Sequence, residues 1–181
     1  MNYTGVVNMM RAYNYAAKMH ASQTYGDLPY IKHLESVFLI LEGHGYHDDI
    51  PLLTAALLHD SLEDTETTED DLRALFGDEV TGLVVLVTDR QGKNRKERHE
   101  RTYPLIRGNA RATALKLSDR LANVTNCWVN REEPKSKGLL AMYKKEHPEF
   151  ARFLHVQGDG NESLWKCIED YFVSEEEAAT L

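Results

Sequence analysis

The segment HDSLED at residues 59–64 concentrates side chains that could do chemistry. It follows directly after Leu57 and Leu58, and a charged pair at the end of a buried helix is costly unless a partner or a metal ion matches it. A histidine beside an aspartate is common by chance, and the pair alone is more often a capped or surface pair than a ligand set. Its position after a buried run favours a metal site formed in part by His59 and Asp60.

Two further side chains could complete such a site. His33 lies upstream in the segment PYIKH, and Asp119 lies downstream in the segment KLSDRL. The surroundings of Asp119 are largely apolar, so a carboxylate at this position needs a buried partner. An ion pair of Asp119 with Arg120 or Lys116 is the alternative explanation, and the sequence leaves it open.

Glu63 and Asp64 follow the histidine–aspartate pair by one turn if the helix continues through the segment, so each would share a face with one member of the pair. Two imidazoles and two carboxylates suit Mn²⁺, Fe²⁺ or Zn²⁺ better than a thiolate-seeking ion. A cation of this kind makes hydroxide available near neutral pH and offsets charge on phosphoryl oxygens. We therefore expect Glu63 and Asp64 to divide two roles, orienting the water and protonating the leaving oxygen.

A positive segment stands out in a chain whose formal charge is −8. Two explanations have about equal support, a solvated helix face and a surface that steers a polyphosphate substrate through Arg95 and Arg98. The basic residues of this segment are Lys93, Arg95, Lys96, Arg98, Arg101, Arg107 and Arg111.

Length and composition predict one globular domain, because 181 residues with 42% hydrophobic and 28% charged residues are ordinary for a protein with a single core. We expect no membrane span and no secretory signal, and therefore a cytoplasmic location. The net negative charge argues against nucleic-acid binding. Cys127 and Cys167 form no metal or redox motif and are interpreted as reduced thiols, although a disulfide between them stays open.

Apolar residues recur at helical spacing along nearly the whole chain, and no alternating strand pattern is visible. The first expected helix begins after Thr4 as its N-cap and buries the stripe Val6, Met10, Tyr13 and Ala17. After a polar loop at residues 21–28, a second helix is expected with the apolar stripe Leu34, Val37, Phe38 and Leu41.

Two of the later helices have recognisable starts. Asp49 before Pro51 is typical of an N-cap and a first-turn proline, and it opens the apolar run 52–58 of a buried central helix. Thr68 and Asp71 resemble a capping box that opens a short helix ending at Gly77. A further helical pattern covers residues 80–87, and the remaining helices are expected within 93–107, 111–124, 139–154 and 162–173.

Five motifs in fixed order resemble the HD superfamily. They are PYIxH at 29–33, ALLHDxxEDT at 56–65, FG at 76–77, VTD at 87–89 and KLxDRLxN at 116–123. Within that superfamily they are most similar to the hydrolase domain of the Rel/SpoT type and its small stand-alone relatives, which remove the 3′-pyrophosphate from guanosine alarmones such as guanosine 3′,5′-bis(diphosphate), ppGpp. The similarity extends from about residue 20 to residue 124, well over half of the chain.

This resemblance implies an all-α fold, an HD-domain helical bundle of roughly eight to ten helices, here at residues 1–174 with an acidic C-terminal tail at 175–181. It implies one divalent metal, usually Mn²⁺, and hydrolysis of a nucleotide phosphate or pyrophosphate. The roles it implies are metal ligation by His33, His59, Asp60 and Asp119, acid–base catalysis by Glu63 and Asp64, and a nucleotide contact by Asn123.

The loop QTYGDL at residues 23–28 departs from the family, whose members carry an Arg or Lys pair there that packs against the guanine nucleotide. Tyr25 could stack on a base instead. The departure leaves other nucleotides open as substrates, including dNTPs, cyclic nucleotides and NADPH. A non-catalytic, metal-binding regulatory domain is the alternative of a different class, and the oligomeric state is left open.

The other histidines match no ligand motif, and we expect them at surface or helix-end positions. They are His20, His44, His47, His99, His147 and His155.

Overall fold

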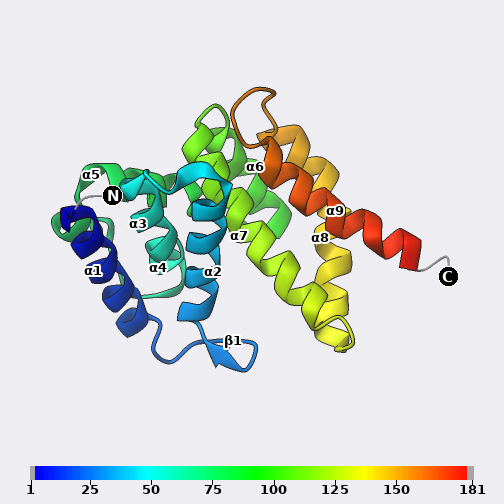
Figure 1. The fold of residues 1–181 in the computed structure, drawn as a ribbon, viewed down its shortest axis with the longest axis horizontal. Helices are drawn as coiled ribbons and strands as arrows, with labels where there is room; N and C mark the ends of the chain where they lie inside the picture. The colour runs from blue at the N-terminus through cyan, green and yellow to red at the C-terminus, as the bar shows by residue number, and fades with distance from the viewer. Residues whose placement is uncertain (1–2, 179–181) are drawn as a thin grey trace.

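The computed structural model describes residues 3–178, and the side chains of residues 3–173. Its described residues form nine α-helices, which confirms the predicted all-α bundle (Figure 1). The helices are α1 (Tyr3–Met19), α2 (Ile31–Leu41), α3 (Ile50–Leu58), α4 (Ser61–Asp64), α5 (Glu69–Val87), α6 (Arg95–Ile106), α7 (Ala110–Val129), α8 (Pro134–Leu154) and α9 (Glu162–Ala178). A π-helical turn, η1 (Glu42–Tyr46), follows α2.

Helix α7 is the central element of the bundle. It packs against α2, α3 and α5 on one side and against α8 and α9 on the other (Figure 1). Its first turn is capped by Asn109, whose side chain accepts a hydrogen bond from the Ala112 amide at 3.0 Å. Since small and apolar side chains cover most of its circumference, α7 can be buried along its length and still carry Asp119 at its middle.

Helix α3 has the predicted start and the predicted burial. The Asp49 carboxylate accepts a hydrogen bond from the Leu52 amide at 3.1 Å, and Pro51 lies in the first turn. Every residue from Leu52 to Leu58 is buried. The helix therefore points its C-terminal end, and the residues that follow it, into the interior of the bundle.

Helix α5 begins with the predicted capping box. The Asp71 amide donates to the Thr68 hydroxyl oxygen, and the Thr68 amide donates to the Asp71 carboxylate at 3.0 Å. Gly77 has φ +84° and interrupts the helical backbone at the position where the sequence predicted a stop. The residues after it return to a helix that buries Val80, Leu83, Val84 and Val87.

The predicted apolar stripe of α1 is wrong by one position. Val6 and Met10 are 38% and 61% exposed, while the buried residues are Gly5, Met9, Ala12 and Ala16. Small side chains on this face let α1 approach α3 closely, and close packing favours them over the larger residues beside them. Thr4 lies inside the helix, which begins at Tyr3, and so is not its N-cap.

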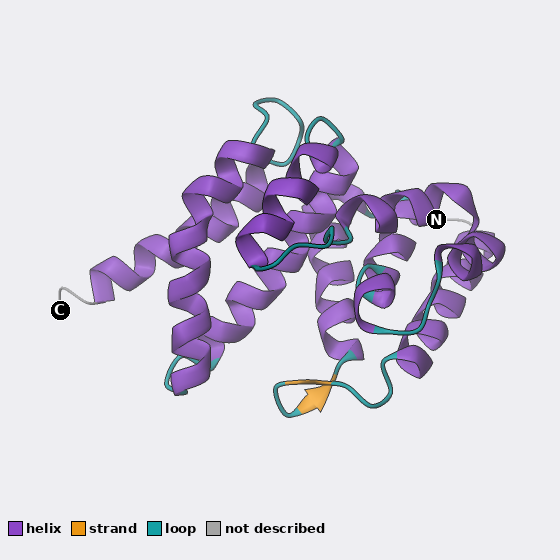
Figure 2. Cartoon of the chain, turned by 180° about the vertical axis from the view of Figure 1, so that it is seen from behind, coloured by secondary structure: helices purple, strands orange, loops and turns teal. Residues whose placement is uncertain are grey.

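The loop before α2 contains a short hairpin that the sequence did not predict. Strands β1 (Thr24–Tyr25) and β2 (Leu28–Pro29) pair in antiparallel fashion around Gly26, which has φ +62° (Figure 2). Two-residue strands are too short to give an alternating pattern. The hairpin places the Tyr25 ring against His33 in the first turn of α2, with ring centres 4.9 Å apart.

At the other end of the chain, α9 leads away from the bundle and reaches Ala178 (Figure 1). It therefore includes the first part of the predicted acidic tail, and residues 179–181 lie outside the described residues. The boundary between domain and tail stays a prediction. No helix of the described part of the chain is long and apolar enough to cross a membrane.

Candidate metal and phosphate site

The histidine–aspartate pair lies in a turn between α3 and α4. Helix α3 ends at Leu58, and Asp60 has φ −91° and ψ −3° before α4 begins at Ser61. The helix therefore does not continue unbroken through the segment, as the shared-face argument had assumed. The turn still keeps the segment compact, because the Glu63 and Asp64 amides both donate to the Asp60 carbonyl oxygen, at 3.2 and 2.9 Å.

His59 is held in one tautomer by the end of α3. Its Nδ1 lies 2.9 Å from the Ala56 carbonyl oxygen, which can only accept a hydrogen bond, so the ring hydrogen is on Nδ1. Its Nε2 is buried and has no hydrogen-bond partner. A buried nitrogen lone pair without a partner is unusual in a folded protein and is the form in which imidazole binds a metal.

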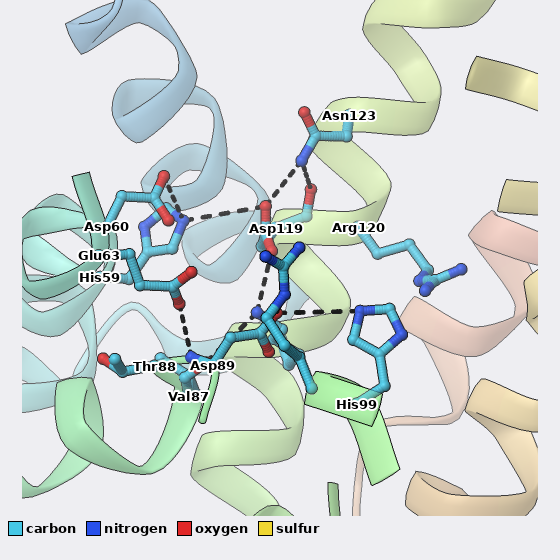
Figure 3. A network of polar contacts seen from close by, with 12 residues as sticks. His59, Asp60, Glu63, Val87, Thr88, Asp89, His99, Asp119, Arg120 and Asn123 are labelled. Carbon is cyan, nitrogen blue, oxygen red and sulfur yellow. Dashed lines mark hydrogen bonds and ion pairs between the residues drawn. The ribbon is translucent and has the colours of Figure 1, made fainter. Parts of the chain in front are cut away.

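The four predicted ligands converge from α2, α7 and the turn after α3. His33 Nε2 lies 3.4 Å from Asp60 Oδ2 and 3.3 Å from Asp119 Oδ1. His59 Nε2 lies 3.1 and 3.8 Å from the same two oxygens. Donor atoms of His33, His59 and Asp60 all lie within 4.8 Å of one another, and Figure 3 shows Asp119 facing His59 and Asp60 from α7. This mixed nitrogen and oxygen set fits a divalent cation.

The two carboxylates of this cluster are held in their ionised form. Burial alone would raise the pKa of Asp60, but the adjacent His59 and His33, whose Nε2 atoms lie 3.1 and 3.4 Å from Asp60 Oδ2, lower that pKa. The pKa of Asp119 is likewise lowered, against the effect of burial, by His33, His59 and the neighbouring Lys116. Ionised carboxylates are the form that a cation requires. Asp119 contacts both imidazoles and also forms the ion pair with Lys116 that the sequence left open, with Asp119 Oδ2 3.6 Å from Lys116 Nζ.

A second layer of side chains orients the carboxylates. The Tyr30 hydroxyl donates to Asp60 Oδ2 at 2.6 Å, and the Asn123 amide donates to Asp119 Oδ1 at 2.8 Å. The Tyr25 hydroxyl in turn donates to Asn123 Oδ1 at 3.2 Å, while its ring centre lies 4.9 Å from that of His33. Tyr25 and Asn123, predicted as substrate contacts, thus direct their polar atoms toward the ligand cluster.

Glu63 and Asp64 differ in their position relative to the site. Glu63 lines the cavity beside the cluster, and its Oε1 accepts a hydrogen bond from the Asp89 amide at 2.7 Å (Figure 3). Its carboxyl group keeps access to solvent, yet the protein packed around it raises its pKa. Asp64 is not among the residues that line the cavity, although desolvation and the charge of Asp60 raise its pKa too.

The cavity has a volume of about 180 Å³ and two chemically different walls. Three of the proposed ligands, His33, Asp60 and Asp119, form one wall together with Glu63. The other wall carries the cationic groups Arg95, Arg98 and Arg120, and Lys116 lies between the two walls, 3.6 Å from Asp119 Oδ2. Such a wall in a protein of net negative charge matches a substrate with several phosphate groups.

Glu146 of α8 ties two of these cations together. Its carboxylate lies 3.0 Å from Arg95 Nε and 3.5 Å from an Arg120 guanidinium nitrogen. Both guanidinium groups lie over the ring of Tyr143, at 5.6 and 5.3 Å from its centre. The sequence analysis missed Arg120 and Lys116 as cavity residues, although both lie in the motif that contains Asp119.

The basic residues of the positive segment divide between the cavity and the surface outside it. Arg95 and Arg98 line the cavity, as expected for a substrate contact. Arg101 pairs with Glu97, and Arg111 pairs with Asp49 and Glu79 outside the cavity.

Three histidines expected at surface or helix-end positions are largely buried. His20 is 2% exposed and stacks on Tyr30, and His147 packs among aromatic side chains below the basic wall. His99 lines the cavity and stacks on Tyr103, with ring centres 4.6 Å apart. Burial and the nearby Arg95 lower the pKa of His99 to about 3. A motif search misses it, because its place in the cavity depends on how α6 packs against the other helices that line the cavity.

Comparison with known proteins places this geometry in a family. The family model described as "HD domain" matches residues 12–143. A Danio rerio protein named guanosine-3′,5′-bis(diphosphate) 3′-pyrophosphohydrolase MESH1 is 34% identical over 155 residues, which cover 83% of this chain and 84% of the relative. An Aquifex aeolicus guanosine-3′,5′-bis(diphosphate) 3′-pyrophosphohydrolase is 42% identical over 135 residues, 71% of this chain, and the chain spans only 19% of that longer protein.

Solved structures agree with the sequence comparison. A metazoan orthologue of SpoT, described as hydrolysing ppGpp, superposes with a TM-score of 0.76 at 29% identity and covers 93% of this chain and 95% of its own. A Listeria monocytogenes protein superposes with a TM-score of 0.61 at 28% identity over 80% of this chain. The matched family region spans α2 to α7 and contains all four converging residues. The chain therefore belongs to the HD-domain family.

Proposed function

We propose that the protein is a metal-dependent phosphohydrolase that removes the 3′-pyrophosphate from a nucleotide of the guanosine 3′,5′-bis(diphosphate) type. The observation that carries this proposal is one cavity lined both by members of a cluster that could hold a metal ion and by several cationic side chains. The names of the Danio rerio and Aquifex aeolicus relatives support the same reaction.

His33, His59, Asp60 and Asp119 would hold one divalent cation, with Mn²⁺ favoured. The family implies a divalent metal, and the buried unpartnered Nε2 of His59 supports one at this position. When bound, the cation supplies Lewis-acid chemistry, making hydroxide available near neutral pH and offsetting charge that builds on the phosphoryl oxygens.

Glu63 holds and moves the proton in this proposal. Its Oε1 is fixed by the Asp89 amide, so the second carboxyl oxygen can face the cavity. A raised pKa increases the protonated fraction of Glu63 near neutral pH, as a group that protonates the departing 3′-oxygen requires. Asp64, outside the cavity lining, has a supporting role in orienting water at the rim.

Arg95 and Arg98 hold the phosphate groups that are not cleaved. Both belong to the first turn of α6 and face the ligand cluster across the cavity. Guanidinium groups can bind phosphate oxygens in a bidentate manner, and Glu146 limits the freedom of Arg95. A nucleotide with phosphate groups at both ends of its ribose could bridge the two walls.

The test is a panel of nucleotides incubated with Mn²⁺-loaded protein, with pyrophosphate and phosphate release followed by ³¹P NMR. We expect pyrophosphate from ppGpp, and no release from the Asp119→Asn variant. The panel includes a dNTP, a cyclic nucleotide and NADPH, because the hairpin around Tyr25 lacks the basic pair of the family. Absence of turnover on every member, with Mn²⁺ bound, would show a non-catalytic metal-binding domain instead.

A further inference from the structure

Lys116 is a largely buried cation at the junction of the two cavity walls. It lies on α7 one turn before Asp119, and its side chain is 14% exposed. Its ammonium group donates to the Val87 carbonyl oxygen at 3.3 Å, which fixes its position. Lysine carries a positive charge at neutral pH, and this side chain lines the cavity together with Glu63, Asp89 and Asp119.

The Asp119 carboxylate is shared between this ammonium group and the ligand cluster. Its Oδ1 faces His33 Nε2 at 3.3 Å and His59 Nε2 at 3.8 Å. Its Oδ2 faces Lys116 Nζ at 3.6 Å. One carboxylate thus connects the place of the proposed metal to a second positive charge.

This arrangement has the layout of a two-cation site. In two-metal phosphohydrolases, two ions about 3.5–4 Å apart act on the attacking and leaving oxygens together. Carboxylates that could ligate a second ion are close by, since Glu63 and Asp89 line the same cavity as Asp119 and Lys116. Asp89 Oδ1 is buried and has no hydrogen-bond partner, while Asp89 Oδ2 lies 3.7 Å from Arg98 Nε. The ammonium group of Lys116 lies beside one of these carboxylates, 3.6 Å from Asp119 Oδ2.

We propose that Lys116 takes the place of a second metal ion, contacting an oxygen of the departing pyrophosphate and limiting the centre to one divalent cation. This inference rests on the proposed phosphohydrolase function. It makes Lys116 a catalytic residue whose charge stabilises the negative charge that develops during the reaction.

The proposal has a consequence that a purely structural role lacks. A fixed positive charge next to a metal site repels the metal, yet it accelerates a reaction in which negative charge builds up. Removing the charge should therefore strengthen Mn²⁺ binding and slow turnover. If Lys116 only held Asp119 in position, its removal would weaken Mn²⁺ binding and slow turnover together.

The experiment compares the full-length protein with Lys116→Met, Lys116→Gln and Lys116→Arg, and uses Lys166→Met as a control on the exposed surface of α9. Mn²⁺ affinity and stoichiometry are measured by titration with EPR detection of free Mn²⁺. For both neutral variants we expect Mn²⁺ binding to be several-fold tighter and kcat to be about 100-fold lower. Lys116→Arg should retain most of both wild-type values, and the control should match the wild type.

Two results would overturn the proposal. One is weaker Mn²⁺ binding in every neutral variant that folds by circular dichroism, and the other is an unchanged kcat. A further arm measures the binding of inorganic pyrophosphate to the Mn²⁺-loaded protein, where we expect about a tenfold loss in the neutral variants. This arm separates the two proposals, because it can succeed or fail even if the nucleotide panel reveals no turnover.

A gain of metal provides an independent check. Lys116→Asp adds a carboxylate to the three already there and leaves room for an ion, so we expect the Mn²⁺ stoichiometry to rise from one to two per chain. A stoichiometry that remains at one in the folded variant would contradict the assignment of this position as a cation site.

Discussion

The two walls of the cavity are built in different ways. The proposed metal-binding wall has a short-range centre: His59, Asp60 and Glu63 come from one hexapeptide that main-chain hydrogen bonds at the end of α3 hold compact, and only His33 and Asp119 come from other helices. The cationic wall is assembled from α6, α7 and α8, and ion pairs to Glu146 hold it. We therefore propose a division of labour, in which the first wall sets the chemistry and the second selects and orients the substrate.

The largest effect is expected from breaking the metal-binding wall. Asp119→Asn removes a charged ligand, and we expect loss of Mn²⁺ binding and a fall in kcat of at least about 1,000-fold. Metal content by mass spectrometry and ppGpp turnover measure the two effects. Asp78→Asn on the exposed part of α5 is the matched control. Full activity of Asp119→Asn with bound metal would remove this residue from the ligand set.

The next effect separates the two acidic residues after the metal pair. Glu63→Gln should lower kcat about 100- to 10,000-fold while Mn²⁺ affinity stays near that of the wild type, because the group transfers a proton and binds no metal. Asp64→Asn should cost clearly less, since Asp64 does not line the cavity. Equal losses of kcat in both variants would show instead that Glu63 and Asp64 contribute equally to catalysis.

Breaking the cationic wall should act mainly on substrate binding. Reversing the charges in Arg95→Glu and Arg98→Glu should raise KM about tenfold each and weaken the dependence of kcat/KM on salt, with a smaller change in kcat. Arg101→Glu, outside the cavity, is the matched charge reversal. If all three behave alike, the segment acts through its overall charge alone.

Substitutions in the second layer, the side chains that hydrogen-bond to the proposed ligands, should have a smaller effect on the affinity for Mn²⁺. Asn123→Ala removes the hydrogen bond to Asp119 and should weaken Mn²⁺ binding about tenfold. Tyr25→Phe acts through Asn123 and should cost only a few-fold. Tyr13→Phe, whose hydroxyl bonds to Glu35 on the outside of α2, serves as the control. Unchanged Mn²⁺ affinity with a raised KM would instead return Tyr25 to the role of a base contact.

The smallest effect concerns stability and pH. The pKa of His99 is about 3 in the folded protein, below its ordinary value of about 6.5, so the unfolded chain binds more protons between these values. Stability contributed by neutral His99 is thus fully present above pH 6.5 and is lost as the pH falls toward 3. Urea unfolding at pH 7.5 and 5.5 should show a smaller loss for His99→Gln than for the wild type. An identical loss would show that His99 does not carry this pH dependence.

Local signals made most of the fold predictable. The caps at Asp49 and Thr68, the break at Gly77 and the buried run of α3 were all readable because each depends on neighbouring residues. The buried face of α1 was not predictable, because it depends on how closely α3, which lies further along the chain, approaches α1. The hairpin was missed for a different reason, as its strands are too short to show a period.

The same distinction between local and long-range signals applies to the candidate site. His59 and Asp60 were predicted from residues beside them, whereas the cavity positions of His99 and Arg120 depend on contacts between α6, α7 and α8. The motif that contains Asp119 placed that residue among the ligands, yet nothing in it showed that Lys116 would meet the acidic groups of two other segments. Long-range charge networks of this kind become visible only when the helices are assembled.

The direction in which two helices enter the cavity adds an electrostatic consequence. Helix α3 ends at Leu58, immediately before the ligand pair, and therefore presents the negative end of its dipole to the cation. Helix α6 begins at Arg95 and presents its positive end, with Arg98 in the same turn, to the opposite wall. The backbone alone thus creates a potential gradient across the cavity with the polarity needed by a metal at one end and a phosphate at the other, before any charged side chain is counted.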